Sequence, residues 1–382
     1  MQKFTLVRAG LLVTLGLLGS AHAAKVKIGF VAPMSGPLGV NGEAAKLGAQ
    51  MALQSMKDEL SRAGYEVSFV EVDEVNITAV AAGAKALASD PEVLGVLGPT
   101  FSGTAMIVSD MFRPSGLLML SGSASAAELT DRGYPNVART VARTDAQGSA
   151  MAEYLVQRTQ LRKVLLVSDN TAYGNGLADD FSDAAKLRNL TVVTRVNTNA
   201  KSGFEDVVAL TRASKPDVVY FSGAQDTALA LLRELRGSAS DVVFAGGSAF
   251  EDPAFLRNGA GLVKGVLYTT TFGPLNRFVS GSSFTNQYTQ AFNKAPNIFS
   301  AFMHDTTRVM LKALVAAKRG PNGMPSRADV AAAVRKVSFS GVTGPISFNS
   351  KGDRLRSPLF VIKVNESTGA PEALEKRIVR AK

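Results

Sequence analysis

The chain is predicted to be an α/β protein made of two doubly wound parallel-sheet lobes in tandem. Short apolar runs alternate with longer amphipathic segments, the alternation restarts after Arg139, and no low-complexity linker separates the halves. Strand, helix and strand in repetition are typical of a parallel sheet that is covered on both faces.

In each half, four apolar runs are predicted to be buried strands, and the segments between them to be helices. The first half has strands at Val26–Ala32, Val67–Val72, Val93–Leu97 and Leu117–Leu120, with helices at Glu43–Arg62, Ile77–Ser89 and Thr104–Phe112. The second half has strands at Val164–Val167, Thr191–Val196, Val218–Phe221 and Val242–Ala245, with helices at Ala146–Arg158, Leu177–Arg188, Phe204–Ser214 and Thr227–Arg236.

The remaining residues are expected to complete both lobes rather than to form a third domain. They read as helices and strands at Phe284–Phe292, Ala301–Lys318, Arg327–Val337, Gly341–Phe348 and Pro358–Val364. Two of these helices and one strand would complete the first lobe, and the last strands would return to the second. Residues 24–142 plus 273–345 are then the N-terminal lobe, and residues 143–272 plus 346–382 are the C-terminal lobe. The extended connections Arg139–Arg143 and Tyr268–Phe272 would act as hinges.

The first 23 residues are predicted to be a signal peptide. Lys3 and Arg8 precede an apolar run from Ala9 to Leu18, and Ala21-His22-Ala23 supplies the small residues that signal peptidase accepts. The run is too short to span a bilayer comfortably. The mature protein should therefore begin near Ala24 and be periplasmic.

Composition excludes several classes of protein. The chain has no cysteine, which rules out disulfides, a thiolate nucleophile, a cysteine zinc site and a lipid anchor after the cleavage site. Without residues 1–23 it keeps 40 basic and 32 acidic residues, and these are scattered rather than gathered into runs with aromatic side chains. A nucleic-acid partner is therefore not expected.

Enzyme signatures are scarce, and the chain is predicted not to be an enzyme. It has no G-K-[ST] phosphate loop, no GxGxxG after the first strand and no GxSxG elbow. Its one histidine after the signal peptide, His304, lies in a predicted helix and is expected to line the core or the inter-lobe cleft. We therefore predict no catalytic residue, no cofactor and no metal. A secreted α/β hydrolase is the enzyme class that remains as an alternative.

Small and hydroxylated residues follow three predicted strands of the first lobe. These segments are Ala32 to Pro37, Gly98 to Thr104 and Ser121 to Ser125. Ligands of open parallel sheets bind beyond the carboxyl ends of the strands. Ser102 is well placed to cap the following helix, where free backbone N–H groups bind anions. The alternative interpretation is capping and turn formation without a ligand.

The order and spacing of several motifs resemble the branched-chain amino-acid binding proteins of bacterial ABC transporters. The resemblance covers essentially the whole mature chain, and its markers are Met34-Ser35-Gly36-Pro37, Gly98 to Thr104 leading to Ser109-Asp110, Glu128-Leu129-Thr130 before Arg132-Gly133-Tyr134, Asp145-Gln147-Gly148, Tyr173-Gly174-Gly176-Leu177, and Gly344-Pro345 before Lys351-Gly352-Asp353. It implies a type I periplasmic binding fold with a three-strand hinge. It further implies a monomer that closes on a small-molecule ligand and delivers it to a membrane permease.

The resemblance also implies the residues that bind the ligand. Ser102 stands where the family's serine hydroxyl binds the α-carboxylate, Ser123 where a backbone carbonyl meets the ammonium, and Ser125 where a threonine hydroxyl contacts the ligand. Tyr173 matches the aromatic residue of the C-terminal lobe that closes over the ligand.

Two positions depart from the family pattern. Ala224 replaces a tyrosine, and Ser248 replaces the glutamate that pairs with the ammonium. A buried ammonium requires a partner, so Glu251, or alternatively Asp226, is expected to supply the carboxylate. The departures leave three possibilities open: an amino acid with an apolar side chain, an aliphatic or aromatic carboxylate for the same type of transporter, and a periplasmic sensor module.

Overall fold

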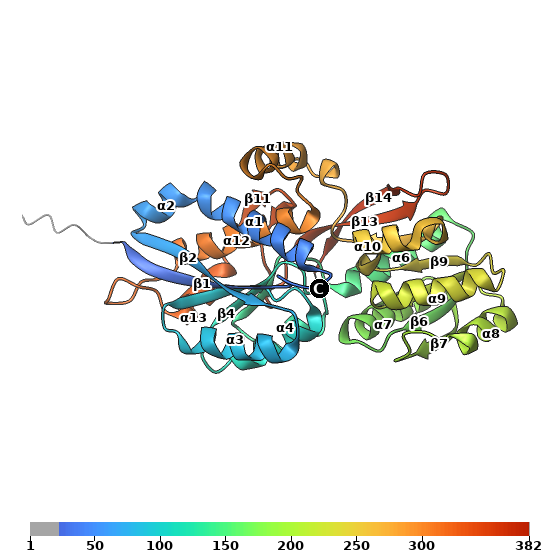
Figure 1. Cartoon of the computed structure of the whole chain (residues 1–382). Coiled ribbons are helices and arrows are strands. Elements are labelled where there is room, and N and C mark those ends of the chain that lie inside the picture. The colour runs from blue at the N-terminus through green and yellow to red at the C-terminus, as the bar shows by residue number, and fades with distance from the viewer. Residues whose placement is uncertain (1–22, 382) are drawn as a thin grey trace, which may run out of the picture.

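The computed structural model describes residues 23–381, which form two lobes (Figure 1). The N-lobe contains a five-stranded parallel sheet in the order β2-β1-β3-β4-β5. Its strands are β1 (Ala24–Ala32), β2 (Tyr65–Asp73), β3 (Val93–Leu97), β4 (Leu118–Ser121) and β5 (Val137–Arg139). Its helices are α1 (Gly39–Ser55), α2 (Lys57–Arg62), α3 (Ile77–Ser89), α4 (Ser102–Phe112), α5 (Glu128–Asp131), α11 (Gly281–Phe292), α12 (Ile298–Ala316) and α13 (Arg327–Val334). A separate hairpin joins β11 (Phe339–Gly341) to β12 (Gly344–Ile346).

The C-lobe contains a seven-stranded sheet in the order β14-β13-β10-β9-β8-β6-β7. The pairings of β13 with β10 and with β14 are antiparallel, and the other pairings in this sheet are parallel. The strands are β6 (Lys163–Ser168), β7 (Thr191–Asn197), β8 (Val218–Ser222), β9 (Val243–Gly246), β10 (Leu267–Thr270), β13 (Arg356–Val364) and β14 (Pro371–Arg380). The helices are α6 (Thr144–Arg158), α7 (Ala172–Lys186), α8 (Glu205–Ser214), α9 (Gln225–Gly237), α10 (Pro253–Gly259) and the short η1 (Ser248–Glu251) and η2 (Ala260–Val263). A further short helix, η3 (Leu275–Arg277), follows the second connection between the lobes and contacts α11.

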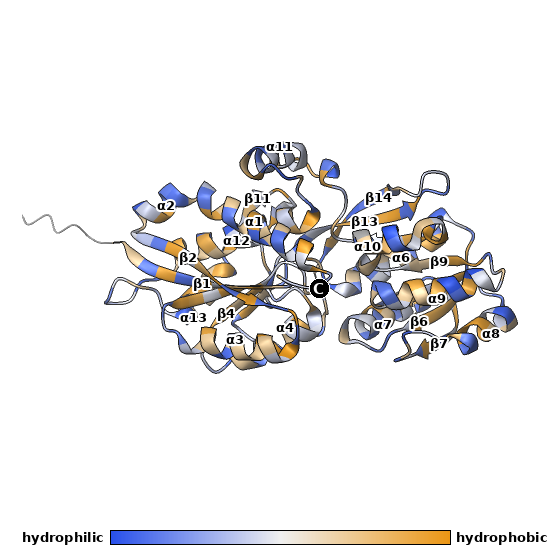
Figure 2. Ribbon diagram, in the orientation of Figure 1, coloured by the Kyte–Doolittle hydropathy of each residue, from blue (hydrophilic) through white to orange (hydrophobic). Residues whose placement is uncertain are grey.

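Each sheet is covered by hydrophobic clusters on both faces. In the N-lobe one cluster gathers apolar residues of α1, α12 and α13, and another gathers those of α3 and α4. In the C-lobe α6 and α7 cover one face, whereas α9 and α10 cover the other. Figure 2 shows the central strands as mostly hydrophobic and the outer helices as two-sided. Within residues 23–381 every helix is too short or too polar to cross a membrane.

The predicted fold class is confirmed, and several predicted elements are corrected. The helix expected at Glu43–Arg62 is divided into α1 and α2 at Met56, whose side chain is buried in the core of the N-lobe. The strand expected at Gly341–Phe348 is part of the β11–β12 hairpin, because Gly344 adopts φ +101° at its turn. Among the described residues, β11 and β12 pair only with each other. Residues 273–345, which were predicted to complete the N-lobe, therefore add helices but no strand to its sheet.

The hinge segments are also shorter than predicted. Arg139 is the last residue of β5, and Tyr268 lies within β10, where it pairs with β13. The three connections between the lobes are residues 140–143, 271–274 and 347–355. The predicted lobe boundaries stay predictions, and the predicted signal peptide lies, apart from Ala23, outside the described residues.

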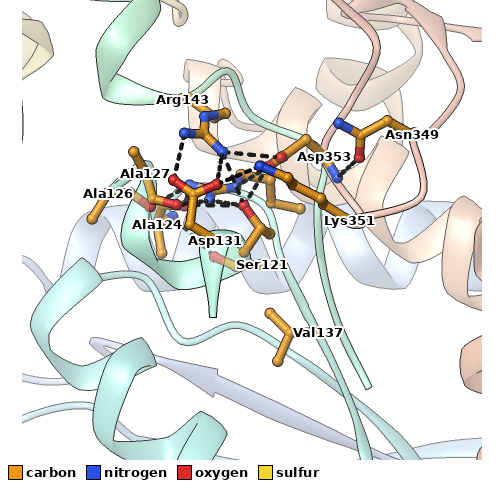
Figure 3. Close-up of polar contacts among 12 residues, drawn as sticks. Ser121, Ala124, Ala126, Ala127, Asp131, Val137, Arg143, Asn349, Lys351 and Asp353 are labelled. Carbon is orange, nitrogen blue, oxygen red and sulfur yellow. Dashed lines mark hydrogen bonds and ion pairs between the residues drawn. The ribbon is translucent and has the colours of Figure 1, made fainter. Parts of the chain in front are cut away.

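A buried ion cluster ties the first connection to the third (Figure 3). The Asp353 carboxylate lies 2.8 Å from Arg139 Nε and 3.3 Å from Arg143 Nη1, and it accepts a hydrogen bond from Thr130 Oγ1 at 2.7 Å. The side chains of Arg139 and Asp353 are 0% and 1% exposed. Burial lowers the pKa of Arg139 to about 10, so the guanidinium stays charged at neutral pH.

The cluster continues toward the surface. Arg143 donates to both oxygens of Asp131 at 2.9 and 2.8 Å, and Lys351 Nζ lies 2.9 Å from the same carboxylate. These bonds, chiefly those from Arg143, hold the pKa of Asp131 well below its ordinary value. Arg354 adds a second link, since it donates to the carbonyl oxygen of Thr140 at 3.1 Å and to that of Thr343 at 2.8 Å.

We predict that Asp353→Asn destabilises the protein by about 3–5 kcal/mol, because removing one member of a buried ion pair leaves its partners uncompensated. Chemical denaturation measures the change. The matched control is Asp179→Asn, which removes an exposed partner of Arg195 and should cost less than about 1 kcal/mol. Equal, small losses in both variants would contradict the role assigned to Asp353.

Candidate ligand-binding site

Ser102 begins α4 at the carboxyl end of the N-lobe sheet. Its hydroxyl accepts a hydrogen bond from the N–H of Ala126 at 3.2 Å, which leaves the hydroxyl proton free to be donated. The prediction that Ser102 caps the helix is wrong, because the N-cap residue is Phe101 and no side chain caps this end. The N–H groups of Ser102, Gly103 and Thr104 make no hydrogen bond within the described residues.

Glu74 holds the loop in front of α4. Its carboxylate follows β2 and accepts the N–H groups of Thr100 at 2.7 Å and Phe101 at 3.0 Å. Burial raises the pKa of Glu74 to about 7, although the two N–H groups oppose the shift. Glu74 was not among the residues predicted from the sequence. The signal that could have found it is an acidic residue directly after a predicted strand.

Ser123 and Ser125 lie in the loop after β4, beside Ser102. Ser123 Oγ donates to the carbonyl of Thr100 at 2.9 Å, whereas its own carbonyl accepts no hydrogen bond from any described residue. The Ser125 carbonyl accepts the N–H of Thr144, the first residue of α6, at 2.8 Å, and among residues 23–381 its hydroxyl has no partner. The structure therefore brings the three predicted serines together.

An apolar hollow opens next to this serine loop. Its polar lining residues are Thr100, Ser123 and Asn41, and the others are Pro33, Ala45, Gly122, Phe299, Phe302 and Met303. Its volume of about 10 Å³ holds one water molecule, so a larger apolar group would enter only after the lining side chains move.

Tyr173 and Ser248 meet in the C-lobe. Tyr173 lies in the first turn of α7, and its hydroxyl lies 3.3 Å from Ser248 Oγ. Gln147 Oε1 accepts the N–H of Ser248 at 3.0 Å, and its buried Nε2 has no partner among the described residues. Gln147 belongs to one of the motifs that resemble the family, but it was not among the predicted ligand-binding residues. Its position on α6, about 100 residues before Ser248, gave no local signal of this contact.

Glu251 lies at the other end of η1 and is directed toward β10. Its Oε2 accepts a hydrogen bond from the hydroxyl of Thr270, and burial raises the pKa of Glu251 well above its ordinary value. No hydrogen bond among the described residues joins Glu251 to Tyr173 or Ser248. Asp226, the alternative carboxylate, is exposed in the first turn of α9 and accepts the N–H of Thr227 at 2.9 Å.

The two groups of candidate residues lie on facing sides of the lobe boundary. In Figure 1, α4 and α7 approach each other there, and these helices carry Ser102 and Tyr173. The boundary therefore offers hydroxyl groups and an apolar hollow from the N-lobe, and a tyrosine and a serine from the C-lobe.

The raised pKa of Glu74 predicts how the stability of the protein depends on pH. Between about pH 4.5 and 7 the folded protein keeps a proton that the unfolded chain has lost. The free energy of unfolding should therefore fall as pH rises through this range, by about 3 kcal/mol in total. Glu74→Gln should remove this part of the pH dependence. Chemical denaturation at a series of pH values measures both proteins, and an identical slope in each would contradict the assignment.

Comparisons with known proteins agree with this architecture. A family model described as periplasmic binding protein matches residues 25–370. The Leu/Ile/Val-binding protein BraC3 of Rhizobium johnstonii is 33% identical over 264 residues, which cover 68% of this chain and 71% of that protein.

Two solved structures share the fold. The leucine-binding protein LivK of Thermotoga maritima has a TM-score of 0.81 and 22% identity, over 92% of this chain and 98% of its own. A solute-binding protein of an ABC transporter from R. palustris, solved with benzoate, has a TM-score of 0.78 and 20% identity, over 94% of this chain and 98% of its own.

Proposed function

This chain belongs to the periplasmic binding protein family, and on that premise we propose that it captures an amino acid with an apolar side chain between its lobes. As a member of this family it is a solute-binding protein and not an enzyme, in agreement with the prediction from sequence. Closure about the three connections encloses the ligand, and the closed protein delivers it to the membrane permease of an ABC importer.

The observation that supports this ligand class is the serine loop beside the apolar hollow. The free N–H groups at the start of α4 and the hydroxyls of Ser102 and Ser125 can all donate to a carboxylate, as helix N-termini do for anions. The carbonyl of Ser123 can accept from an ammonium, and the apolar side chains of Phe299, Phe302 and Met303 beside the serine loop can pack against an aliphatic side chain. Leucine, which is named as a ligand of the Rhizobium and Thermotoga proteins, has a carboxylate, an ammonium and an aliphatic side chain.

Ser102→Ala should weaken leucine binding by at least about tenfold, because a hydrogen bond to a charged group contributes about 1.5–3 kcal/mol. Calorimetry on the folded variant measures the affinity, and Ser125→Ala should show a similar loss. Ser89→Ala is the control, because Ser89 is an exposed residue at the end of α3, away from the lobe boundary. Unchanged affinity in both cleft variants would remove these serines from the site.

One observation favours a second candidate, an aliphatic or aromatic carboxylate without an amine. Ser248, next to the hydroxyl of Tyr173, supplies a hydroxyl where the resemblance implies a glutamate, and Glu251 is held by Thr270 with a raised pKa. A protonated carboxyl group carries no negative charge, so Glu251 can compensate the ammonium of a ligand only if binding of that ligand makes Glu251 lose its proton. The R. palustris protein, which shares the fold, was solved with benzoate.

The variant Glu251→Gln distinguishes an amino-acid ligand from a carboxylate ligand without an amine. If Glu251 pairs with an ammonium, the variant should lose about 2–5 kcal/mol of leucine binding but little binding of 4-methylpentanoate, which is leucine without its amine. Calorimetry with both ligands measures the difference. Tighter binding of 4-methylpentanoate or benzoate than of leucine by the wild type would support the second candidate.

We further propose that residues 1–23 direct export and are removed after Ala23, and that the mature protein acts as a monomer in the periplasm. The intact mass of the exported protein tests the cleavage, and a protein that keeps these residues would contradict it. A periplasmic sensor partner is the alternative to a permease. Neighbouring genes for permeases and ATPases support transport, whereas a neighbouring sensor kinase gene supports sensing.

A further inference from the structure

A second pocket opens on the N-lobe, among α2, α11, α12 and the β11–β12 hairpin. Its volume is about 360 Å³, within the range of small-molecule sites. Its lining residues are Ser55, Met56, Glu59, Ser280, Ser283, Phe284, Gln287, His304, Arg308, Lys312, Ser340, Gly341 and Val342. None of them lines the apolar hollow at the lobe boundary.

Three basic side chains of α12 line this pocket in one row. His304, Arg308 and Lys312 are four residues apart, a spacing that places them on the same face of a helix. Arg308 and Lys312 are half-buried in a helix whose other residues belong mostly to the core of the N-lobe. A cation at such a position loses part of its hydration.

The structure gives these two cations an aromatic contact but no counter-ion. The Arg308 guanidinium lies 4.7 Å from the ring centre of Phe339, and Lys312 Nζ lies 5.9 Å from it. Within residues 23–381, neither side chain makes an ion pair or a hydrogen bond, although Glu59 lies on the same pocket wall. The two cations outnumber that one carboxylate.

The remaining polar groups of the pocket suit an anion. His304 is held at the base, where its Nδ1 lies 3.3 Å from Asp305 Oδ1. Asp305 does not reach the cations, because it accepts the N–H groups of Val342 and Thr343 at 3.0 and 2.7 Å. The hydroxyls of the lining serines and the amide of Gln287 can donate to further oxygens of a ligand.

We propose that this pocket binds a small multivalent oxyanion, with Arg308 and Lys312 as its counter-ions. Arginine matches the paired oxygens of carboxylates and phosphates, and lysine adds a point charge. Glu59 makes no ion pair with either cation among the described residues, so a ligand with two or more negative charges can pair with both. The site is independent of the ligand held between the lobes.

Titration calorimetry tests the proposal with two probes, citrate for polycarboxylates and inorganic phosphate for phosphates. The full mature protein is used at constant ionic strength, with chloride as the reference salt. At least one probe should bind, and the double variant Arg308→Gln/Lys312→Gln should weaken its binding by at least about tenfold. The probe that binds more tightly identifies the class of oxyanion.

The control is Lys318→Gln/Lys336→Gln, which removes two exposed lysines outside the pocket and changes the net charge equally. It should keep the affinity within about twofold, as expected for distant screened charges. Circular dichroism checks the fold, and Lys312→Gln alone replaces the double variant if the loss of the Arg308–Phe339 contact disturbs it. Equal losses in the control and the pocket variant, or no binding of either probe, would overturn the proposal.

Discussion

The buried pairing of Asp353 with Arg139 and Arg143 is the constraint on which the arrangement of the two lobes depends. It joins residues that lie about 210 positions apart in the chain: Arg139 at the end of β5 and Arg143 in the first connection pair with Asp353 in the third. Charges buried this deeply are tolerated only when each is paired and hydrogen-bonded. The first and third connections are therefore held together at this cluster, and bending between the lobes takes place in their remaining residues.

The same cluster positions the ligand site. The Arg139 guanidinium donates to the carbonyl oxygens of Ala124, Ala126 and Ala127 at 3.3, 2.7 and 3.2 Å. These residues belong to the loop that carries Ser123 and Ser125. The N–H of Ala126 in this loop also donates to the hydroxyl of Ser102. The Ser125 carbonyl in turn binds the first residue of α6, in the C-lobe. The hinge and the predicted carboxylate site thus share one network of hydrogen bonds, which gives lobe rotation a direct physical connection to ligand binding.

Sequence patterns predicted the buried parallel strands well, because uninterrupted apolar runs mark strands that are covered on both faces. The strands that were missed lack this signal. β5 has three residues, and β10 ends in polar threonines. In β14 charged residues separate two short apolar pairs, Ala373-Leu374 and Ile378-Val379, and the exposure alternates along this edge strand. Their pairing is decided by the tertiary fold.

The candidate site was predicted in part for a similar reason. Ser102, Ser123 and Ser125 follow strand ends, and a strand end can be identified from the chain itself. The partners that hold the C-lobe residues come from distant segments, as Gln147 does for Ser248 and Thr270 does for Glu251. No local pattern connects such pairs. The side-chain direction of Glu251 therefore became visible only in the fold.

If an amino acid with an apolar side chain closes the two lobes about this hinge, the protein becomes more compact when it binds. Small-angle X-ray scattering of the mature protein, titrated with leucine, isoleucine and valine, measures this closure directly. We expect the radius of gyration to fall and saturate with at least one of these ligands, as the lobes approach across α4 and α7. A radius of gyration that stays constant with all three would contradict it.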